Sequence, residues 1–163
     1  MLKYEFTNET KKIKDAFGNF HTLHRIKALK DFGNVHKGDL GGWLEKESNL
    51  SQGGYCWVYD NAMVYNDAKV YDSAGVYDNA QVYGNARVYG NAQVYDDCEV
   101  YINAKVYDDA QVFGHARVYD DARVFGHAKV YDDAQVQGNA RVCNTSVVCG
   151  DTEVCGEIEI LGD

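Results

Sequence analysis

The stretch AQVYGNARVYGN, residues 80–91, holds two successive copies of a six-residue unit. Its general form is Ala-x-Val-Tyr-(Gly/Asp)-(Asn/Asp), where x is variable. The Val position recurs in 18 consecutive steps of six from Val58 to Ile160, with 17 Val and one Ile. The position two residues before it holds 13 Ala. A period this strict predicts a solenoid, in which each repeat packs mainly against its neighbours.

Within each unit, small, variable, apolar and aromatic positions follow one another with a period of two, which predicts a short β-strand. The Ala and Val positions share one face of that strand, and the variable and Tyr positions share the other. Gly, Asp and Asn come next, and these residues tolerate the positive φ of tight turns. The chain contains no Pro, which suits strands that donate backbone hydrogen bonds throughout. Each unit therefore predicts one strand and one corner around an interior of Val and Ala.

The repeat resembles that of the hexapeptide-repeat family, whose members fold as a left-handed parallel β-helix. The resemblance covers about two-thirds of the chain and implies three units in each triangular coil. We therefore expect an all-β fold: a single-stranded left-handed parallel β-helix of about six triangular coils with a small N-terminal β cap. The cap is expected at residues 1–43 and the β-helix at residues 44–163, because Leu44 and Leu50 lie in steps of six before Cys56.

The N-terminal segment has a different pattern. YEFT (4–7) and HTLHRIKAL (21–29) predict two strands, and GDLGGW (38–43) predicts a tight entry turn anchored by Trp43. Together with the repeats, this segment resembles a family of uncharacterised bacterial and phage hexapeptide-repeat proteins. Members are often labelled transferases, but that label rests on the fold alone.

Charge is divided unevenly along the chain. The net charge is −9, made up of +2 in residues 1–55 and −11 in residues 56–163. An acidic solenoid argues against direct binding to nucleic acid or to a membrane surface. The N-terminus has no apolar core of a signal peptide, and the five Cys suit a reducing compartment. A cytoplasmic location is expected.

A coil of three units stacks each residue on the equivalent residue three units further along the chain. On the third face of each coil, this register aligns five cations beside the aromatic positions. Stacked cations favour an acidic partner or a phosphate-bearing ligand. The alternative is a solvated face balanced by corner acids, beside tyrosines that only brace the rod. The candidate binding residues are Lys69, Arg87, Lys105, Arg123, Arg141, Tyr71, Tyr89 and Tyr107.

One corner concentrates carboxylates, and we call it the acidic edge. An edge of this kind can imitate nucleic acid toward a basic host protein, although turn preference alone also explains Asp at corners. No metal and no cofactor are expected, since neither His nor Cys has metal-ligand spacing. The acidic edge consists of Asp60, Asp78, Asp96, Asp97, Asp132 and Asp133.

A catalytic hypothesis rests on His115 and His127, each in a Gly-His-Ala unit. Enzymes of the resembled fold are commonly acyltransferases that use a His at a trimer interface on CoA or acyl-carrier substrates. The resemblance therefore implies these two residues as candidate bases. Their separation of two units places them at different corners, and the unbroken register leaves no inserted loop to build a pocket. The alternative is that both are turn residues.

Three functions stay open. The favoured one is a non-enzymatic binding or scaffolding solenoid that acts through its outer faces on a protein partner, as a homodimer or homotrimer. The second is a phage or mobile-element inhibitor of a host factor. The third is a hexapeptide-repeat acyltransferase acting as a trimer, so the question of enzymatic activity is left open, with more weight against it.

Overall fold

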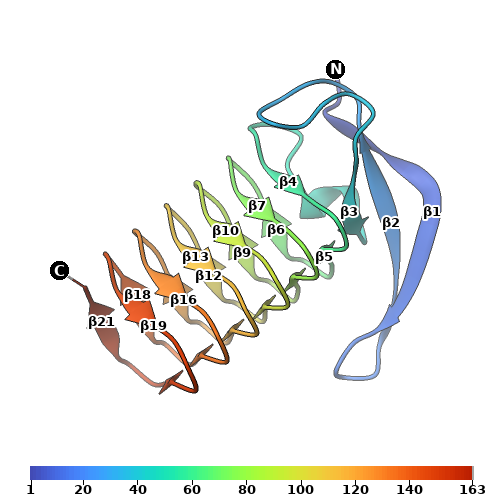
Figure 1. The fold of residues 1–163 in the computed structure, drawn as a ribbon. Helices are drawn as coiled ribbons and strands as arrows, with labels where there is room; N and C mark the ends of the chain where they lie inside the picture. Colours follow the sequence, from blue (N-terminus) through green and yellow to red (C-terminus); the bar gives the residue numbers. More distant parts are fainter. Residues whose placement is uncertain (163) are drawn as a thin grey trace.

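The computed structural model describes residues 1–162, which form a solenoid of stacked coils with an antiparallel hairpin at one end (Figure 1). The hairpin consists of β1 (Tyr4–Lys14) and β2 (Phe20–Ala28). It is followed by β3 (Leu40–Leu44) and a 3-10 helix, η1 (Glu47–Asn49). The coils then begin, and the predicted all-β class is confirmed.

Eighteen short strands form the three parallel faces of the coils. The first face consists of β4 (Trp57–Val58), β7 (Gly75–Val76), β10 (Gln93–Val94), β13 (Gln111–Val112), β16 (Lys129–Val130) and β19 (Val147–Val148). The second consists of β5 (Met63–Val64), β8 (Gln81–Val82), β11 (Glu99–Val100), β14 (Arg117–Val118), β17 (Gln135–Val136) and β20 (Glu153–Val154). The third consists of β6 (Lys69–Val70), β9 (Arg87–Val88), β12 (Lys105–Val106), β15 (Arg123–Val124), β18 (Arg141–Cys143) and β21 (Glu159–Leu161).

Residues that lie three units apart pair with one another, which confirms the predicted coil length. Val94 pairs with Val112 in the parallel register of β10 and β13, for example. The Tyr95 amide donates its hydrogen bond to the Val112 carbonyl at 3.0 Å. Every coil repeats this ladder, so stability is added coil by coil along the rod. A further turn precedes the six complete ones, because β3 pairs with β5 and Leu50 bridges to Val70.

The interior holds the repeated Val and Ala side chains. Each of them from Val58 to Val142 has no exposed surface, and Cys98 occupies an Ala position with no exposed surface either. Leu44 and Leu50 are also buried, as predicted, but they pair with Val64 and Val70 and so stand two residues out of step with Cys56. A core of such small side chains is narrow and close-packed, so function is left to the outer faces.

The corners explain the choice of Gly, Asp and Asn. The first corner residue after each aromatic position adopts positive φ, as at Gly84 (67°) and Asp96 (61°). Gly adopts this conformation without steric cost, and Asp and Asn tolerate it better than other residues. An Asp at this position also links neighbouring coils, because the Asp96 carboxylate accepts a hydrogen bond from the Gly114 amide of the next coil at 3.0 Å.

Ile102 breaks this rule, since a β-branched residue with a φ of 62° is strained. Replacing Ile102 with Asn, the residue found in the same conformation at Asn66 and Asn144, should raise the free energy of unfolding by about 1 kcal/mol. Urea denaturation measures this change. The control Ile102→Val keeps the β-branching and should give no gain, so an equal gain from both variants would contradict strain as the cause.

The entry segment differs from the prediction at GDLGGW. The tight turn is confined to the residues around Gly38, which has a φ of 98°, and the chain is extended from Leu40 to Leu44 as β3. Trp43 does serve as an anchor, since its ring lies beneath the Arg25 guanidinium at 5.5 Å. The predicted division of the chain between residues 43 and 44 stays a prediction. In the structure, β3 spans this point and joins the hairpin to the coils in one sheet.

The hairpin extends the second-face sheet, in the order β1-β2-β3-β5. Leu23 of β2 is buried against Tyr65 and Tyr83 of the second face. Buried His21 connects the hairpin to the coils, with Nε2 3.1 Å from Asp15 and Nδ1 2.9 Å from Glu45. Glu45 in turn accepts the Asn66 amide at 2.6 Å. These contacts place the hairpin tip near the corner between the second and third faces.

His21 is expected to make stability depend on pH. Burial lowers the pKa of His21, but its hydrogen bonds to Glu45 and Asp15 and their negative charges raise it more, so the net shift is upward from 6.5. A group with a raised folded-state pKa stabilises fully below its unfolded value and loses that contribution as pH rises through the folded value. The stability difference between the wild-type chain and His21→Gln should therefore be larger at about pH 6 than at about pH 9. Urea denaturation at both pH values measures it, and a difference that grows with pH would contradict the ion pairs.

Candidate functional site

The third face carries one column of five cations, which we call the basic stripe. The pairing of β9, β12 and β15 sets Arg87, Lys105 and Arg123 side by side in register. Lys69 of β6 and Arg141 of β18 extend the column at its two ends, paired with Arg87 and Arg123. The structure thus brings together all the cations that the three-unit register predicted. The basic stripe consists of Lys69, Arg87, Lys105, Arg123 and Arg141.

Most of the basic stripe lacks a carboxylate partner. Arg141 pairs with Glu159, with Nη1 3.8 Å from Oε1. Over residues 1–162, no other member of the stripe forms a salt bridge. Asp67, two residues before Lys69, is instead held by Lys46 at 2.6 Å. The middle of the stripe therefore consists of cations that no salt bridge within the described residues neutralises.

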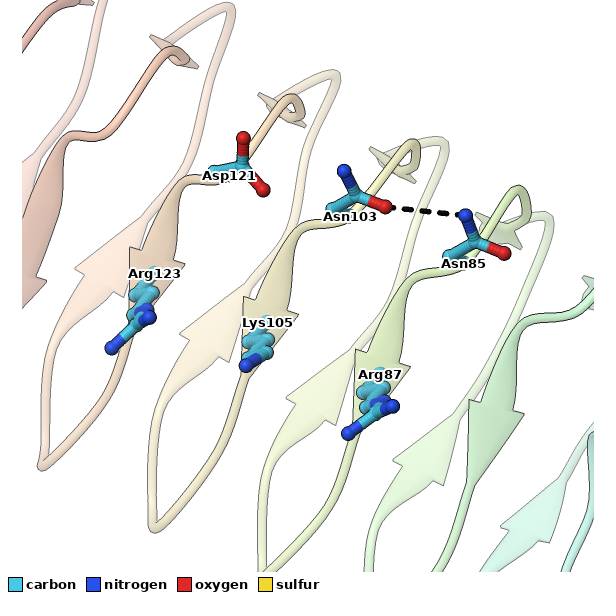
Figure 2. A pocket seen from close by; sticks show the side chains of 6 residues that line it. All are labelled: Asn85, Arg87, Asn103, Lys105, Asp121 and Arg123. Atoms are coloured by element: carbon cyan, nitrogen blue, oxygen red, sulfur yellow. Dashed lines mark hydrogen bonds between the residues drawn. The ribbon is translucent and has the colours of Figure 1, made fainter.

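A groove runs beside the stripe, between the cations and a row of corner side chains. Figure 2 shows Arg87, Lys105 and Arg123 in one row, with the corner residues in a second row opposite. The corner residue Asn85 donates its side-chain amide to Asn103 at 3.2 Å. One cavity of about 230 Å³ is lined by Asn85, Arg87, Asn103, Lys105, Asp121 and Arg123. The next, of about 460 Å³, is lined by Asp121, Arg123, Asn139 and Arg141.

The two cavities share Asp121 and Arg123, so they lie next to each other along the rod, and together we call them the groove. Its walls offer guanidinium, ammonium and side-chain amide donors. Such donors suit the oxygens of carboxylates and phosphates, and the paired N–H groups of Arg suit them best. Asp121 is the one acidic side chain in the lining, and it limits how much negative charge the groove accepts at that point.

The tyrosines of the third face stack beside the stripe. The ring centroids of Tyr71 and Tyr89 are 4.8 Å apart, and those of Tyr89 and Tyr107 are 4.9 Å apart. Phe125 continues the column, and the Arg141 guanidinium lies over its ring at 5.9 Å. Burial raises the pKa of Tyr89, with Asp108 acting in the same direction and Arg123 and Arg87 opposing it. The hydroxyl therefore stays protonated and can donate a hydrogen bond to an anion.

The acidic edge has a structural role. Its residues Asp78 and Asp132 accept amide hydrogen bonds from the next coil at 3.2 and 3.1 Å, as Asp96 does. Asp97 accepts the side-chain amide of Asn79 at 3.0 Å. These carboxylates hold the corner together while remaining exposed along it. A role in imitating nucleic acid stays a prediction.

The two candidate catalytic histidines lie apart, each on its own corner. The side chains of His115 and His127 are 68 % and 71 % exposed. Their Nδ1 atoms lie 3.9 Å from Asp97 and 3.7 Å from Asp109, respectively. Neither histidine lines the groove of the basic stripe. The structure therefore places each as a solvated corner residue beside one carboxylate.

The sequence interpretation missed the amide row of the groove. Asn85, Asn103 and Asn139 line the cavities, and each stands two residues before a cation of the stripe. That spacing was a usable signal, because side chains two apart on an extended chain point to the same side. In the described part of the chain, no three His, Cys, Asp or Glu side chains gather as metal ligands. No helix among the same residues has the length and apolar character to cross a membrane.

Comparisons with known proteins agree with this fold. Residues 80–96 and 110–126 match the family model described as the YdcK beta solenoid repeat. A protein named "Uncharacterized acetyltransferase YdcK", from Escherichia coli (strain K12), is 36% identical over 72 residues, which are 42% of this chain and 22% of that protein. The chain thus spans about a fifth of the length of the curated relative that it matches. With the three parallel sheets, these matches fit a left-handed β-helix family, as the resemblance implied.

Proposed function

We propose that this protein is a non-enzymatic binding solenoid, which captures an acidic segment of another protein in the groove of the basic stripe. One observation carries the proposal: Arg87, Lys105 and Arg123 stand in register and line one cavity without a salt bridge. Like charges held this close repel one another, and an anionic ligand relieves that repulsion. The relative's name indicates an acetyltransferase, which is a different activity, so the proposal rests on the groove.

The groove is suited to a chain of carboxylates. Successive cations are one coil apart, or about 4.8 Å, because they sit on neighbouring strands. The backbone ladder fixes the spacing of the strands that carry them, so only the side chains have to be ordered on binding. The solenoid has a net negative charge, and its cations gather on the third face, so an acidic partner is attracted mainly to that face. An acidic segment is therefore expected to dock on the third face.

The test uses a fluorescently labelled glutamate-rich peptide, with binding followed by fluorescence anisotropy at low salt. The double variant Arg87→Glu/Arg123→Glu should weaken binding by about a hundredfold or more, since it replaces attraction with repulsion at two positions of the same groove. Binding by the wild-type chain should weaken as salt is added. Thermal melting should stay close to that of the wild-type chain, because both side chains lie outside the core.

The matched control is Arg117→Glu/Lys129→Glu, which changes the net charge equally but on the second and first faces. It should retain most of the affinity. Equal losses in the two double variants would show that net charge, and not the groove, governs binding, and the proposal would then fail. Absence of peptide binding by the wild-type chain would also refute it.

Acyl transfer is the second candidate, favoured by the relative that is named an acetyltransferase. The candidate bases are His115 and His127, whose Nδ1 atoms lie 3.9 Å from Asp97 and 3.7 Å from Asp109. This function requires CoA binding, which isothermal titration calorimetry with CoA measures directly. If CoA binds with a 1:1 ratio and Arg87→Glu/Arg123→Glu abolishes it, the groove serves a phosphate-bearing ligand, and the acidic-protein proposal is replaced.

A further inference from the structure

The aromatic column of the first face is broken in the middle. Tyr59 stacks on Tyr77 with ring centroids 4.4 Å apart. Tyr95, Phe113 and Tyr131 form a second stack with spacings of 4.8 Å. Among the ring contacts of the described chain, none joins Tyr77 to Tyr95, although they lie three units apart like every stacked pair of the coils. The other two faces show no such break between their first four rings.

Gly75 explains the break. It is the one Gly at the variable position of the repeats. The Tyr77 ring occupies the space that a Cβ at residue 75 would need. On the second face, tyrosine rings point instead toward the variable residue of the next coil, as Tyr83 does when its hydroxyl donates to Glu99 at 2.7 Å. Because Tyr77 has turned back over Gly75, the next variable residue, Gln93, is left exposed.

The result is a cleft with room for an additional ring. Its volume is about 380 Å³, and Tyr77, Tyr95 and Gln93 line it together with Asp60 and Asp78. Both carboxylates belong to the acidic edge, so the cleft is aromatic inside and negatively charged along one side. An aromatic side chain with a cation beside it would complement this cleft in both shape and charge.

The hairpin tip of the same chain has these properties. Phe17 and Phe20 are 74% and 77% exposed at the connection between β1 and β2, which projects past the first coils in Figure 1. Residues 11–20 carry a net charge of +2, from three Lys and one Asp. Lys14 lies over the Phe20 ring at 5.6 Å, whereas the Asp15 carboxylate is occupied by Asn19 and His21. The tip therefore presents aromatic rings and uncompensated lysines.

The tip of a molecule does not reach its own cleft. His21 and Glu45 fix the base of the tip at Asn66, on the corner between the second and third faces. The cleft lies on the first face, beside the corner at Asp60 and Asp78. These are different corners of the rod, so an occupant with the chemistry of the tip has to come from another copy.

We propose that the hairpin tip of one copy inserts a phenylalanine ring into the first-face cleft of a second copy, with its lysines against the acidic edge. The inserted ring restores the broken stack, and Lys12 and Lys14 neutralise Asp60 and Asp78. Two different surfaces meet, so the copies associate head-to-tail. The copy at each end of such a chain keeps a free tip or a free cleft, unless the chain closes into a cyclic oligomer. The contact does not involve the basic stripe, and its test is independent of the proposed function.

Sedimentation velocity of the full chain over a wide concentration range provides the first test. The wild-type chain should self-associate. The tip variant Phe17→Ser/Phe20→Ser and the cleft variant Gly75→Gln, whose side chain displaces Tyr77 over Gln93, should each weaken association by about tenfold or more. Leu161→Ser, which changes an exposed apolar residue at the far end of the rod, should leave it unchanged. A wild-type chain that stays monomeric overturns the proposal.

A mixing experiment separates this contact from any other mode of association. The tip variant retains an intact cleft, and the cleft variant retains an intact tip. An equimolar mixture should therefore form a 1:1 pair that neither variant forms alone, and it should not grow further. A mixture that stays monomeric, beside a wild-type chain that associates, places self-association on another surface and overturns the proposal. The tip variant alters only exposed side chains, so its result does not depend on tolerance of Gly75→Gln.

Discussion

Replacing Gly42 with Ala is expected to lower the free energy of unfolding by about 3 kcal/mol. A Cβ at residue 42 would lie 2.5 Å from the Ala62 carbonyl oxygen and 2.7 Å from the Val58 side chain. The same carbonyl accepts the Trp43 amide at 2.9 Å, which is the hydrogen bond that joins β3 to the first complete coil. The added methyl group would push β3 away from β5 and break that contact, because the obstructing atom belongs to the backbone and cannot turn aside.

Urea denaturation followed by circular dichroism measures the effect. The control is Gly53→Ala, whose Cβ would meet Ser51 Oγ at 3.6 Å, an ordinary contact, with no positive φ to strain. Gly53→Ala should change the free energy of unfolding by less than about 0.5 kcal/mol. Similar losses in the two variants would contradict the close approach of β3 as the cause.

Replacing Ala104 with Leu in the middle of the rod is expected to cost about 3 kcal/mol. Ala104 has no exposed surface, and its neighbours along the column, Ala86 and Ala122, have none either. The three additional carbons have no void to enter, so the coil must widen. Widening strains the ladder at the Ala104 carbonyl, which accepts the Arg87 amide at 2.9 Å.

The control introduces Leu at the next position of the chain, residue 105. Lys105→Leu faces outward on the third face and should leave the free energy of unfolding within about 0.5 kcal/mol of the wild-type value. Thermal and urea denaturation of both variants measure the contrast. If Ala104→Leu were tolerated as well as Lys105→Leu, the interior would contain space that the structure does not show.

The hairpin shows where sequence reasoning reached its limit. The strand segments around Tyr4 and Leu23 were predicted from their own patterns, and both are confirmed. The prediction of a turn at GDLGGW was wrong for its last four residues, because Gly41 and Gly42 are needed for close approach inside a strand and not for a bend. Glycine serves both purposes, and only the neighbouring backbone distinguishes them. The His21 anchor was equally hidden, since its partners come from a loop and from the end of β3.

The sequence by itself determined the coils. The alternation of small, variable, apolar and aromatic residues is a local property of an extended chain, and the six-residue period repeats it without a break, so core and corners followed directly. The columns also needed the three-unit coil, which the family resemblance implied. Only the tertiary structure decided what the outer faces offer. The groove depends on which corner side chains face the basic stripe, and the cleft depends on the direction in which the Tyr77 ring turns at Gly75. Both are set by side-chain packing between neighbouring coils, which the repeat pattern does not show, although Gly75 and the Asn residues two before three of the cations mark the two places in the sequence.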